Sequence, residues 1–160
     1  MKTIIIVHSS TGTTLNFAED ISDQLKKEKH DVKLVHLQTD PVIKGGSVPK
    51  TASIKFVNLP DIKDYELILL GGPVWGFSAS PIAIAALEKL GNLSEKNFLP
   101  FVTMGFPFPA MGGNRAISMM SDKAKELGAT VLPGKIIPKL FHNFKKQFKI
   151  EAEDIAKIII

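Results

Sequence analysis

The chain has 160 residues and a formal net charge of +4, with 44% apolar and 22% charged residues. These values are typical of one globular domain, 1–160, that buries a core, and they exclude a disordered chain. Cysteine is absent, which excludes disulfides, thiol nucleophiles, iron–sulfur clusters and thiolate zinc sites. The apolar start, Ile4–Val7, is shorter than a signal peptide or a membrane span, so we expect a cytoplasmic protein.

Apolar runs of strand length alternate along the chain with segments of helical periodicity. The pattern predicts strands at 3–8, 31–37, 66–70, 98–104 and 129–137, and helices at 13–29, 81–90, 114–127 and 151–160. Residues 40–64 form a long irregular connection, with a short strand expected at 54–57. This alternation predicts an α/β fold: a three-layer αβα sandwich around a five-stranded parallel sheet of order 2-1-3-4-5. Ligands then bind beyond the carboxyl ends of the first and third strands.

The first loop at that edge, residues 8–14, is rich in hydroxyl groups. Five of them surround one glycine in the run Ser9-Ser10-Thr11-Gly12-Thr13-Thr14. A helix start offers free N–H groups and a partial positive charge, which suits a phosphate. The loop has no lysine and neither glycine-rich nucleotide signature, so we expect a monophosphate held by neutral donors. The alternative is that the hydroxyls cap the helix.

Two further loops carry aromatic residues and glycines. Residues 71–78 hold Trp75, the only tryptophan, between Gly72 and Gly76; it either stacks on a planar ligand or packs on its own domain. Residues 104–114 alternate Phe and Pro before Gly112-Gly113. That loop is interpreted either as a wall of a flat pocket or as an adhesive patch for a partner.

The positive charge is concentrated in residues 135–149, which contain five lysines and no acid. Phe141, Phe144 and Phe148 lie among them at helical spacing. The favoured interpretation is a phenylalanine stripe packed on the sheet with lysines in water; the alternative is a basic amphipathic helix that meets an anionic membrane or an acidic partner. Nucleic-acid binding is not expected, because it requires a broad basic face and a recognisable motif.

Together the loops predict a phosphate cradle between two aromatic walls, a shape that fits FMN. Ser9-Ser10-Thr11-Gly12-Thr13-Thr14 resembles the phosphate signature of the flavodoxin-like family, [Ser/Thr]-x-Thr-Gly-x-Thr. Residues 64–76 resemble the third strand of that family and the loop beside its flavin. Gly112-Gly113-Asn114 resembles a turn of flavodoxin-like reductases. The resemblance spans nearly the whole chain and is weakest at 40–64 and 138–150.

The resemblance implies that the cofactor is FMN and indicates which residues hold it. The phosphate would be held by Ser9, Ser10, Thr11, Gly12, Thr13 and Thr14. The ring would be bordered on one side by Pro73, Val74, Trp75, Gly76 and Phe77, and on the other by Thr103, Met104, Gly105, Phe106, Gly112 and Gly113. Two features depart from the family: Thr13 stands where its carriers usually have Asn, and the chain is basic where they are acidic.

The implied function is electron transfer through the flavin, to a redox partner protein or a small acceptor. It needs no catalytic side chain and no metal. Backbone at Val74–Phe77 would bond the ring, with Gly76 as the point where the peptide turns over. One alternative is an NAD(P)H-dependent FMN or quinone reductase, with Phe106–Met111 as a flap and Lys139 or Arg115 near a phosphate. A further alternative is a flavin-free interaction scaffold. His8 is expected to be structural, and the oligomeric state stays open.

Overall fold

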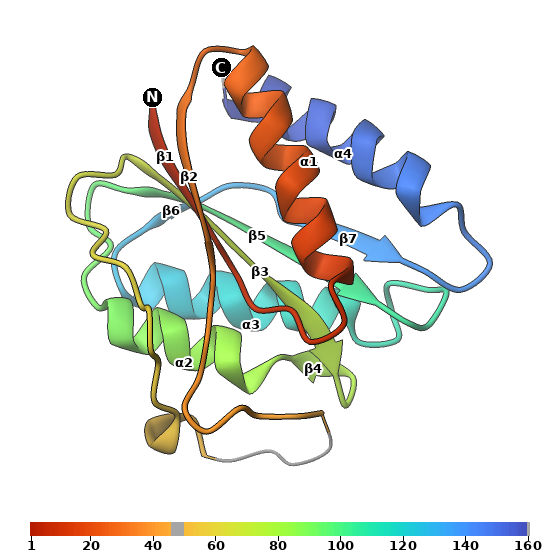
Figure 1. Ribbon diagram of the computed structural model, residues 1–160, viewed down its shortest axis with the longest axis horizontal. Coiled ribbons are helices and arrows are strands. Elements are labelled where there is room, and N and C mark those ends of the chain that lie inside the picture. Colours follow the sequence, from red (N-terminus) through yellow and green to blue (C-terminus); the bar gives the residue numbers. More distant parts are fainter. Residues whose placement is uncertain (46–49, 160) are drawn as a thin grey trace.

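The computed structural model describes residues 1–45 and 50–159, and it alternates strands and helices along the chain (Figure 1). Part of the 40–64 connection, residues 46–49, lies outside the described residues. The strands are β1 (Lys2–Val7), β2 (Asp31–His36), β3 (Leu67–Trp75), β4 (Ser78–Ala79), β5 (Asn97–Met104), β6 (Thr130–Val131) and β7 (Lys135–Pro138). The helices are α1 (Thr13–Lys27), α2 (Pro81–Leu90), α3 (Gly113–Glu126) and α4 (Phe144–Ile159), with a 3-10 turn η1 (Thr51–Ser53).

The central sheet has the strand order β2-β1-β3-β5-β6, and β7 also pairs with β5. All these pairs are parallel, and the order confirms the predicted 2-1-3-4-5 arrangement. The predicted last strand is split: β6 pairs with residues 97–98 and β7 with residues 101–104. Pro100 and Pro133 lie at the gap, and a proline has no N–H for the ladder, which explains the interruption. The short β4 pairs with the end of β3 antiparallel.

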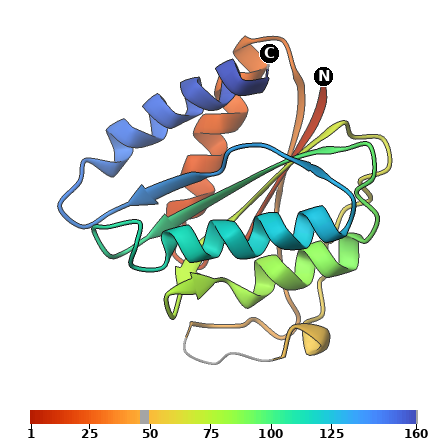
Figure 2. The ribbon, with the colours of Figure 1, turned by 180° about the vertical axis from the view of Figure 1, so that it is seen from behind.

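Helices cover both faces of the sheet, which makes the three predicted layers. Helices α1 and α4 bury one core against one face, and α2 and α3 bury a second core against the other (Figure 2). Strands β1 and β3 are buried on both faces, as expected for parallel strands. None of the described helices has the length and apolar character needed to span a bilayer.

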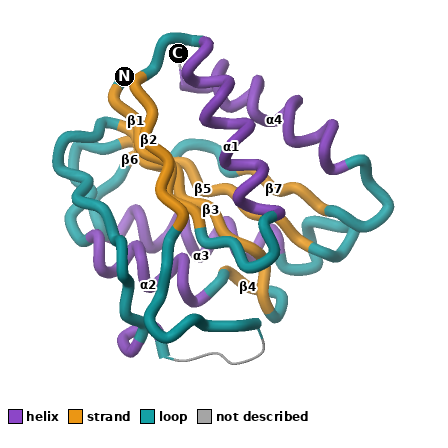
Figure 3. Tube along the Cα trace, viewed as in Figure 1, coloured by secondary structure: helices purple, strands orange, loops and turns teal. Residues whose placement is uncertain are grey.

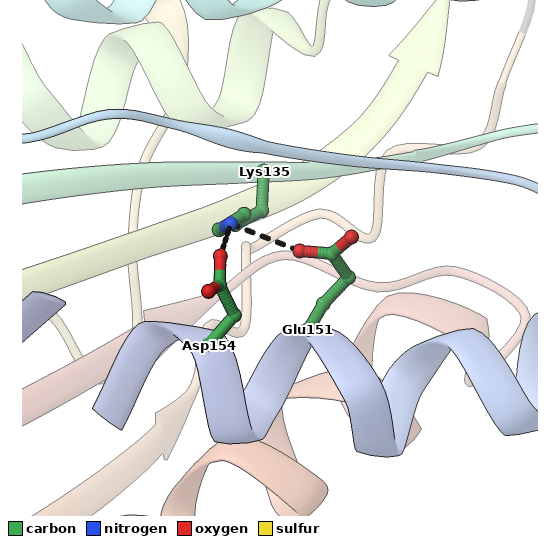
Figure 4. A network of polar contacts seen from close by, with 3 residues as sticks. All are labelled: Lys135, Glu151 and Asp154. Atoms are coloured by element: carbon green, nitrogen blue, oxygen red, sulfur yellow. Dashed lines mark hydrogen bonds and ion pairs between the residues drawn. The ribbon is translucent and has the colours of Figure 1, made fainter. Parts of the chain in front are cut away.

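Helix α4 begins at Phe144, not at Glu151 as predicted. The Oδ1 atom of Asn143 accepts a hydrogen bond from the Lys146 N–H at 3.2 Å, which is an N-cap interaction. The prediction placed the acidic residues in the first turn, where they complement the helix dipole, and so missed a cap seven residues earlier. In the structure, Glu151 and Asp154 instead bind Lys135 of β7 and hold α4 to the sheet (Figure 4).

The ion cluster shifts the pKa of two of its members, Lys135 and Asp154. Burial alone would lower the pKa of Lys135, but hydrogen bonds to Asp154 and Glu151 outweigh burial and raise it. The hydrogen bond from Lys135 lowers the pKa of Asp154. Lys135 and Asp154 therefore stay charged around neutral pH, and the cluster links α4 to the sheet.

Other boundaries also differ from the predictions. Strand β3 continues through Trp75, where a loop was predicted from Gly71, because β4 folds back on it as a hairpin. The strand predicted at 54–57 is reduced to one bridge between Thr39 and Phe56. Phe148 is buried and Phe144 packs beside it, as predicted for the phenylalanine stripe, but Phe141 is 87% exposed and the core interpretation is wrong there.

Candidate functional site

The carboxyl ends of β1, β3 and β5 open onto one edge of the sheet, where the three predicted loops meet (Figure 3). They enclose a hollow of about 180 Å³. Most of the residues predicted to bind a cofactor line it: Ser9, Ser10, Thr11, Thr13, Thr14, Pro73, Val74, Trp75, Thr103, Met104 and Gly105. The structure thus brings together residues almost a hundred positions apart.

The start of α1 forms the floor of this hollow. Its N-cap residue, Gly12, has φ +90°, in the left-handed region, and no side chain among the described residues caps the helix with a hydrogen bond. The Ser9 hydroxyl accepts a bond from the Gly12 N–H at 3.1 Å, which closes the loop before the helix begins. The capping interpretation of the hydroxyls is therefore wrong for α1. Helix-start N–H groups without a side-chain cap suit an anion.

A buried pair of hydroxyls joins the helix to β5. Thr14 Oγ1 and Thr103 Oγ1 lie 2.7 Å apart, and both side chains are almost fully buried. Two hydroxyls carry two hydrogens, and their mutual bond uses one of them. The second hydrogen is available to an acceptor in the hollow that both residues line. An anionic oxygen is such an acceptor.

Lys139 also lines this hollow. It was not predicted to hold the FMN phosphate and was placed near a phosphate only in the reductase alternative. It follows β7, and its Nζ donates to Thr13 Oγ1 at 3.1 Å while lying 5.2 Å from the centre of the Phe144 ring. A cation thus lies beside the hydroxyl loop, where the sequence predicted neutral donors alone. The contact spans 126 positions in the sequence, so no local motif reveals it. The available signal was its place just after the last strand, whose carboxyl end faces the same edge.

The β3–β4 hairpin forms one wall of the hollow. Its turn residues, Gly76 and Phe77, have φ +56° and +60°, the two left-handed residues of a tight hairpin turn. Trp75 lies on the hollow and also packs against the cluster around Ile54 and Ile82. The packing interpretation of the tryptophan is therefore confirmed, and its stacking on a planar ligand stays a prediction.

His8 packs behind Trp75 of the hairpin wall. Its ring meets Trp75 edge-on at 4.9 Å between centroids, and its Nδ1 lies 2.7 Å from Ser80 Oγ. Burial, followed by the charge of His36, lowers the pKa of His8 to about 4. The ring is therefore neutral at neutral pH. It supports the fold of the wall, as predicted, and is not a proton carrier at that pH.

Several predicted site residues lie around the hollow but do not line it. Gly76, Phe77 and Phe106 belong to its exposed outer rim. Gly112 and Gly113 are buried at the start of α3: a Cβ on Gly112 would lie 2.6 Å from the Phe77 Cα, and one on Gly113 would lie 2.8 Å from Ile136. The structure thus gives both glycines a packing role, and their contact with a cofactor stays a prediction.

A second hollow of about 350 Å³ adjoins the first at Ser9 and Ser10. It lies between the ends of β1 and β2, with His36 and residues 42–45 along its wall. Pockets for drug-sized ligands usually measure about 300–1,000 Å³. The hollow at α1 is smaller, so it suits the anionic end of a ligand whose larger part lies along the open rim.

The geometry can be compared with known proteins. No protein-family model matches the chain, and no curated protein sequence matches it either. Solved structures do match over nearly the full length. Flavodoxin 2 from Bacillus cereus is 20% identical with a TM-score of 0.71, covering 99% of this chain and 97% of that one. Two-electron reduced flavodoxin from Megasphaera elsdenii is 21% identical with a TM-score of 0.64, covering 97% and 98%.

A third similar structure is a flavoprotein from Lactobacillus acidophilus in complex with FMN. It is 21% identical with a TM-score of 0.63 and covers 84% of this chain and 92% of that one. These similarities confirm the predicted flavodoxin-like fold, including the sheet order.

Proposed function

We propose that this chain, which has the flavodoxin-like fold, binds FMN and carries electrons through it. The observation that carries the proposal is the start of α1. Within the described part of the chain no side chain caps its N–H groups. Four features meet there in one hollow: the hydroxyl loop, the buried Thr14–Thr103 pair, Lys139 and the hairpin wall. A phosphate monoester attached to a planar ring matches that combination of donors and wall.

The residues present fit the phosphate of FMN. Thr11 and Thr13 offer hydroxyls at the helix start, and Lys139 adds a cation within hydrogen-bond distance of Thr13. The bond between Thr14 and Thr103 uses one of their two hydroxyl hydrogens, and the other is available to a phosphate oxygen. Cationic and hydroxyl donors to a phosphate oxygen make short, strong bonds, so this end of the site would anchor the cofactor.

The planar ring would lie between the hairpin and the loop after β5. Pro73–Trp75 and Thr103–Gly105 border the hollow on these two sides, and Gly76, Phe77 and Phe106 form the rim beyond them. Bound FMN supplies electron transfer, and the protein contributes binding, orientation and local charge. His8 is neutral and engaged with Ser80, so the wall behind Trp75 adds no positive charge near the ring at neutral pH.

Flavodoxins among the similar structures favour a carrier over an NAD(P)H-dependent reductase or a flavin-free scaffold. Steady-state oxidation of NADH and NADPH by the FMN-loaded protein separates the first two functions. A carrier is expected to show no turnover with quinone or free flavin as acceptor. Sustained turnover would favour the reductase and would identify NAD(P)H as the donor.

Titration of flavin-free protein with FMN, followed by quenching of flavin fluorescence, tests the proposal. We expect one-to-one quenching in the wild type, weakened in Thr11→Ala/Thr13→Ala because the helix start loses two hydroxyl donors. Thr51→Ala/Thr130→Ala removes two threonines away from the hollow and should bind like the wild type. Absence of quenching in the wild type would contradict the proposal.

A further inference from the structure

Exposed apolar side chains gather on the outer rim of the candidate site. Phe77, at the tip of the β3–β4 hairpin, stacks on Phe106 with 5.2 Å between ring centroids and 13° between the planes. Further large apolar side chains are exposed on the loop after β5 and on the loop between β7 and α4. We call these residues together the rim patch: Phe77, Phe106, Phe108, Leu140 and Phe141.

Hydrogen bonds hold the loops of the rim patch together. The Leu140 N–H donates to the Gly105 carbonyl at 3.1 Å, and the His142 Nε2 donates to the Pro107 carbonyl at 2.9 Å. The exposed apolar side chains of the two loops therefore lie on segments that are held side by side. An apolar patch of this kind at a site mouth is typical of an interaction surface.

Two residues of the rim patch lie in a backbone conformation that disfavours them. Phe77 has φ +60° and is 51% exposed, and Phe141 has φ +64°. Bulky residues rarely adopt the left-handed region, where glycine or asparagine is less strained. At Phe141 the exposed ring gains little packing to offset this strain. Folding stability therefore does not account for an aromatic residue at this position.

Two lysines beside the rim patch also work against local stability. Lys145 and Lys146 are exposed in the first turn of α4, just after its cap Asn143. A positive charge is unfavourable there, because the helix dipole already places a partial positive charge at that end. A glutamate at position 146 would instead complete a capping box. The lysines thus share with Phe141 a cost that folding does not explain.

The charge around the rim is of one sign. Residues 8–14, 71–80, 104–115 and 138–146 border the candidate site and contain no aspartate or glutamate. They contain four cationic residues: Arg115, Lys139, Lys145 and Lys146. An aromatic centre with a charged margin is the usual anatomy of a protein–protein interface. A margin of lysines selects a partner with carboxylates at the matching positions.

We propose that the rim patch, with Lys145 and Lys146, is the docking surface for an acidic redox protein, one whose exposed apolar spot is surrounded by carboxylates. The redox character of the partner rests on the proposed function, because the patch borders the site assigned to the flavin. The docking itself depends only on residues of the protein surface. It is therefore expected with and without FMN, and failure of FMN binding would leave the docking prediction open to its own test.

The test is a titration of the ¹⁵N-labelled full chain, with and without FMN, against two haem proteins of opposite charge. Cytochrome b5 serves as the acidic probe and cytochrome c as the basic one. We expect cytochrome b5 to shift the amide signals of the rim patch and of residues 139–146, with an affinity that falls about tenfold or more as salt rises from about 20 to about 200 mM. Stronger binding of cytochrome c at low salt would overturn the proposal.

Charge-reversal variants separate docking from folding. Lys145→Glu/Lys146→Glu is expected to weaken cytochrome b5 binding about tenfold or more, while the midpoint of thermal unfolding stays level or rises. Lys26→Glu/Lys33→Glu makes the same change in net charge at exposed residues away from the rim. This control should keep the affinity for cytochrome b5 within about twofold of the wild type. Equal losses in the two variants would mean that net charge alone acts, and the proposal would fail.

Phe141→Asn tests the apolar centre. Asparagine tolerates the left-handed backbone, so the unfolding midpoint is expected to stay level or rise while cytochrome b5 binding weakens several-fold. Unchanged binding would remove Phe141 from the interface and contradict the proposal. Vesicles containing phosphatidylserine are the competing probe: binding to them through the same amides, without binding to cytochrome b5, would assign the face to membranes and overturn the protein partner.

Discussion

Helices α1 and α3 begin alike at the same edge of the sheet, but their surroundings are opposite. Each follows a left-handed glycine, Gly12 at φ +90° and Gly112 at φ +115°, and within the described chain neither has a side-chain cap. A Cβ on Gly12 would meet nothing within 4 Å, whereas one on Gly112 would meet the Phe77 backbone. A glycine before a helix therefore does not by itself make a ligand site; the atoms above it decide.

The side chains after each glycine explain the difference. In α1, Thr13 and Thr14 turn hydroxyls toward a hollow that also receives Lys139. In α3, Gly113 packs against Ile136, and a Cβ on Gly113 would lie only 2.8 Å from that side chain. One helix start is polar and open, and the other is apolar and filled by the hairpin and the sheet.

The largest expected effect is the loss of stability in Gly112→Ala. The new Cβ adds left-handed strain and forces the Phe77 turn to move, so the free energy of unfolding should fall by about 3 kcal/mol. Gly12→Ala adds strain alone and should cost about 1 kcal/mol. Urea unfolding of both variants at pH 7 measures the difference. Equal losses would mean that the two helix starts are equally packed.

Acidification tests a third helix start, that of α2, where Ser80 accepts from the Ile82 N–H and also bonds His8. Because burial and then His36 lower the pKa of His8 to about 4 from 6.5, the unfolded chain takes up the proton first as pH falls. The free energy of unfolding that neutral, buried His8 contributes is fully present above about pH 6.5. It decreases by up to about 3 kcal/mol as the pH falls toward 4.

Urea unfolding at pH 7 and pH 4.5 checks this prediction in three proteins. The wild type and His142→Gln, which changes an exposed histidine, should lose similar stability between the two pH values. His8→Gln should lose clearly less. If the pH dependence of His8→Gln matches that of the wild type, another group is responsible for it.

The next effect is on ligand affinity and concerns Lys139. Lys139→Met keeps the stem over Phe144 and removes the charge, so FMN should bind about 10- to 30-fold more weakly, the cost of one charged hydrogen bond of about 2 kcal/mol. Riboflavin has no phosphate, and its affinity should not change. Lys145→Met is the matched control, because it removes a lysine outside the hollow. A Lys139→Met variant with wild-type FMN affinity would exclude the lysine from phosphate binding.

The smallest expected effect on stability comes from the buried hydroxyl pair. Thr14→Val leaves the Thr103 hydroxyl buried without its partner and should cost about 1 kcal/mol of unfolding free energy. Thr14→Val/Thr103→Val removes both groups and should cost less than the single change. FMN affinity should fall in both variants. A double variant that loses more stability than the single one would show that the pair serves folding and not the ligand.

The sequence allowed prediction of the strands, their order and the hydroxyl loop, because these depend on local periodicity and on one short motif. It could not separate Gly12 from Gly112, since both precede a helix and only the packed hairpin distinguishes them. Lys139 was not assigned to the predicted FMN phosphate for the same reason: its partner Thr13 is distant in the sequence. The start of α4 was misplaced because the acids at 151–154 complement the dipole of a helix start, whereas the true cap is Asn143.

The most direct test of the central claim is a comparison of FMN and riboflavin binding to the same flavin-free protein by isothermal titration calorimetry. If the start of α1 and Lys139 hold a phosphate, FMN should bind at least about a hundredfold more tightly than riboflavin, because only FMN reaches those charged and hydroxyl donors. Equal affinities would contradict a phosphate site at α1, and absence of binding by both flavins would contradict the flavin site as a whole.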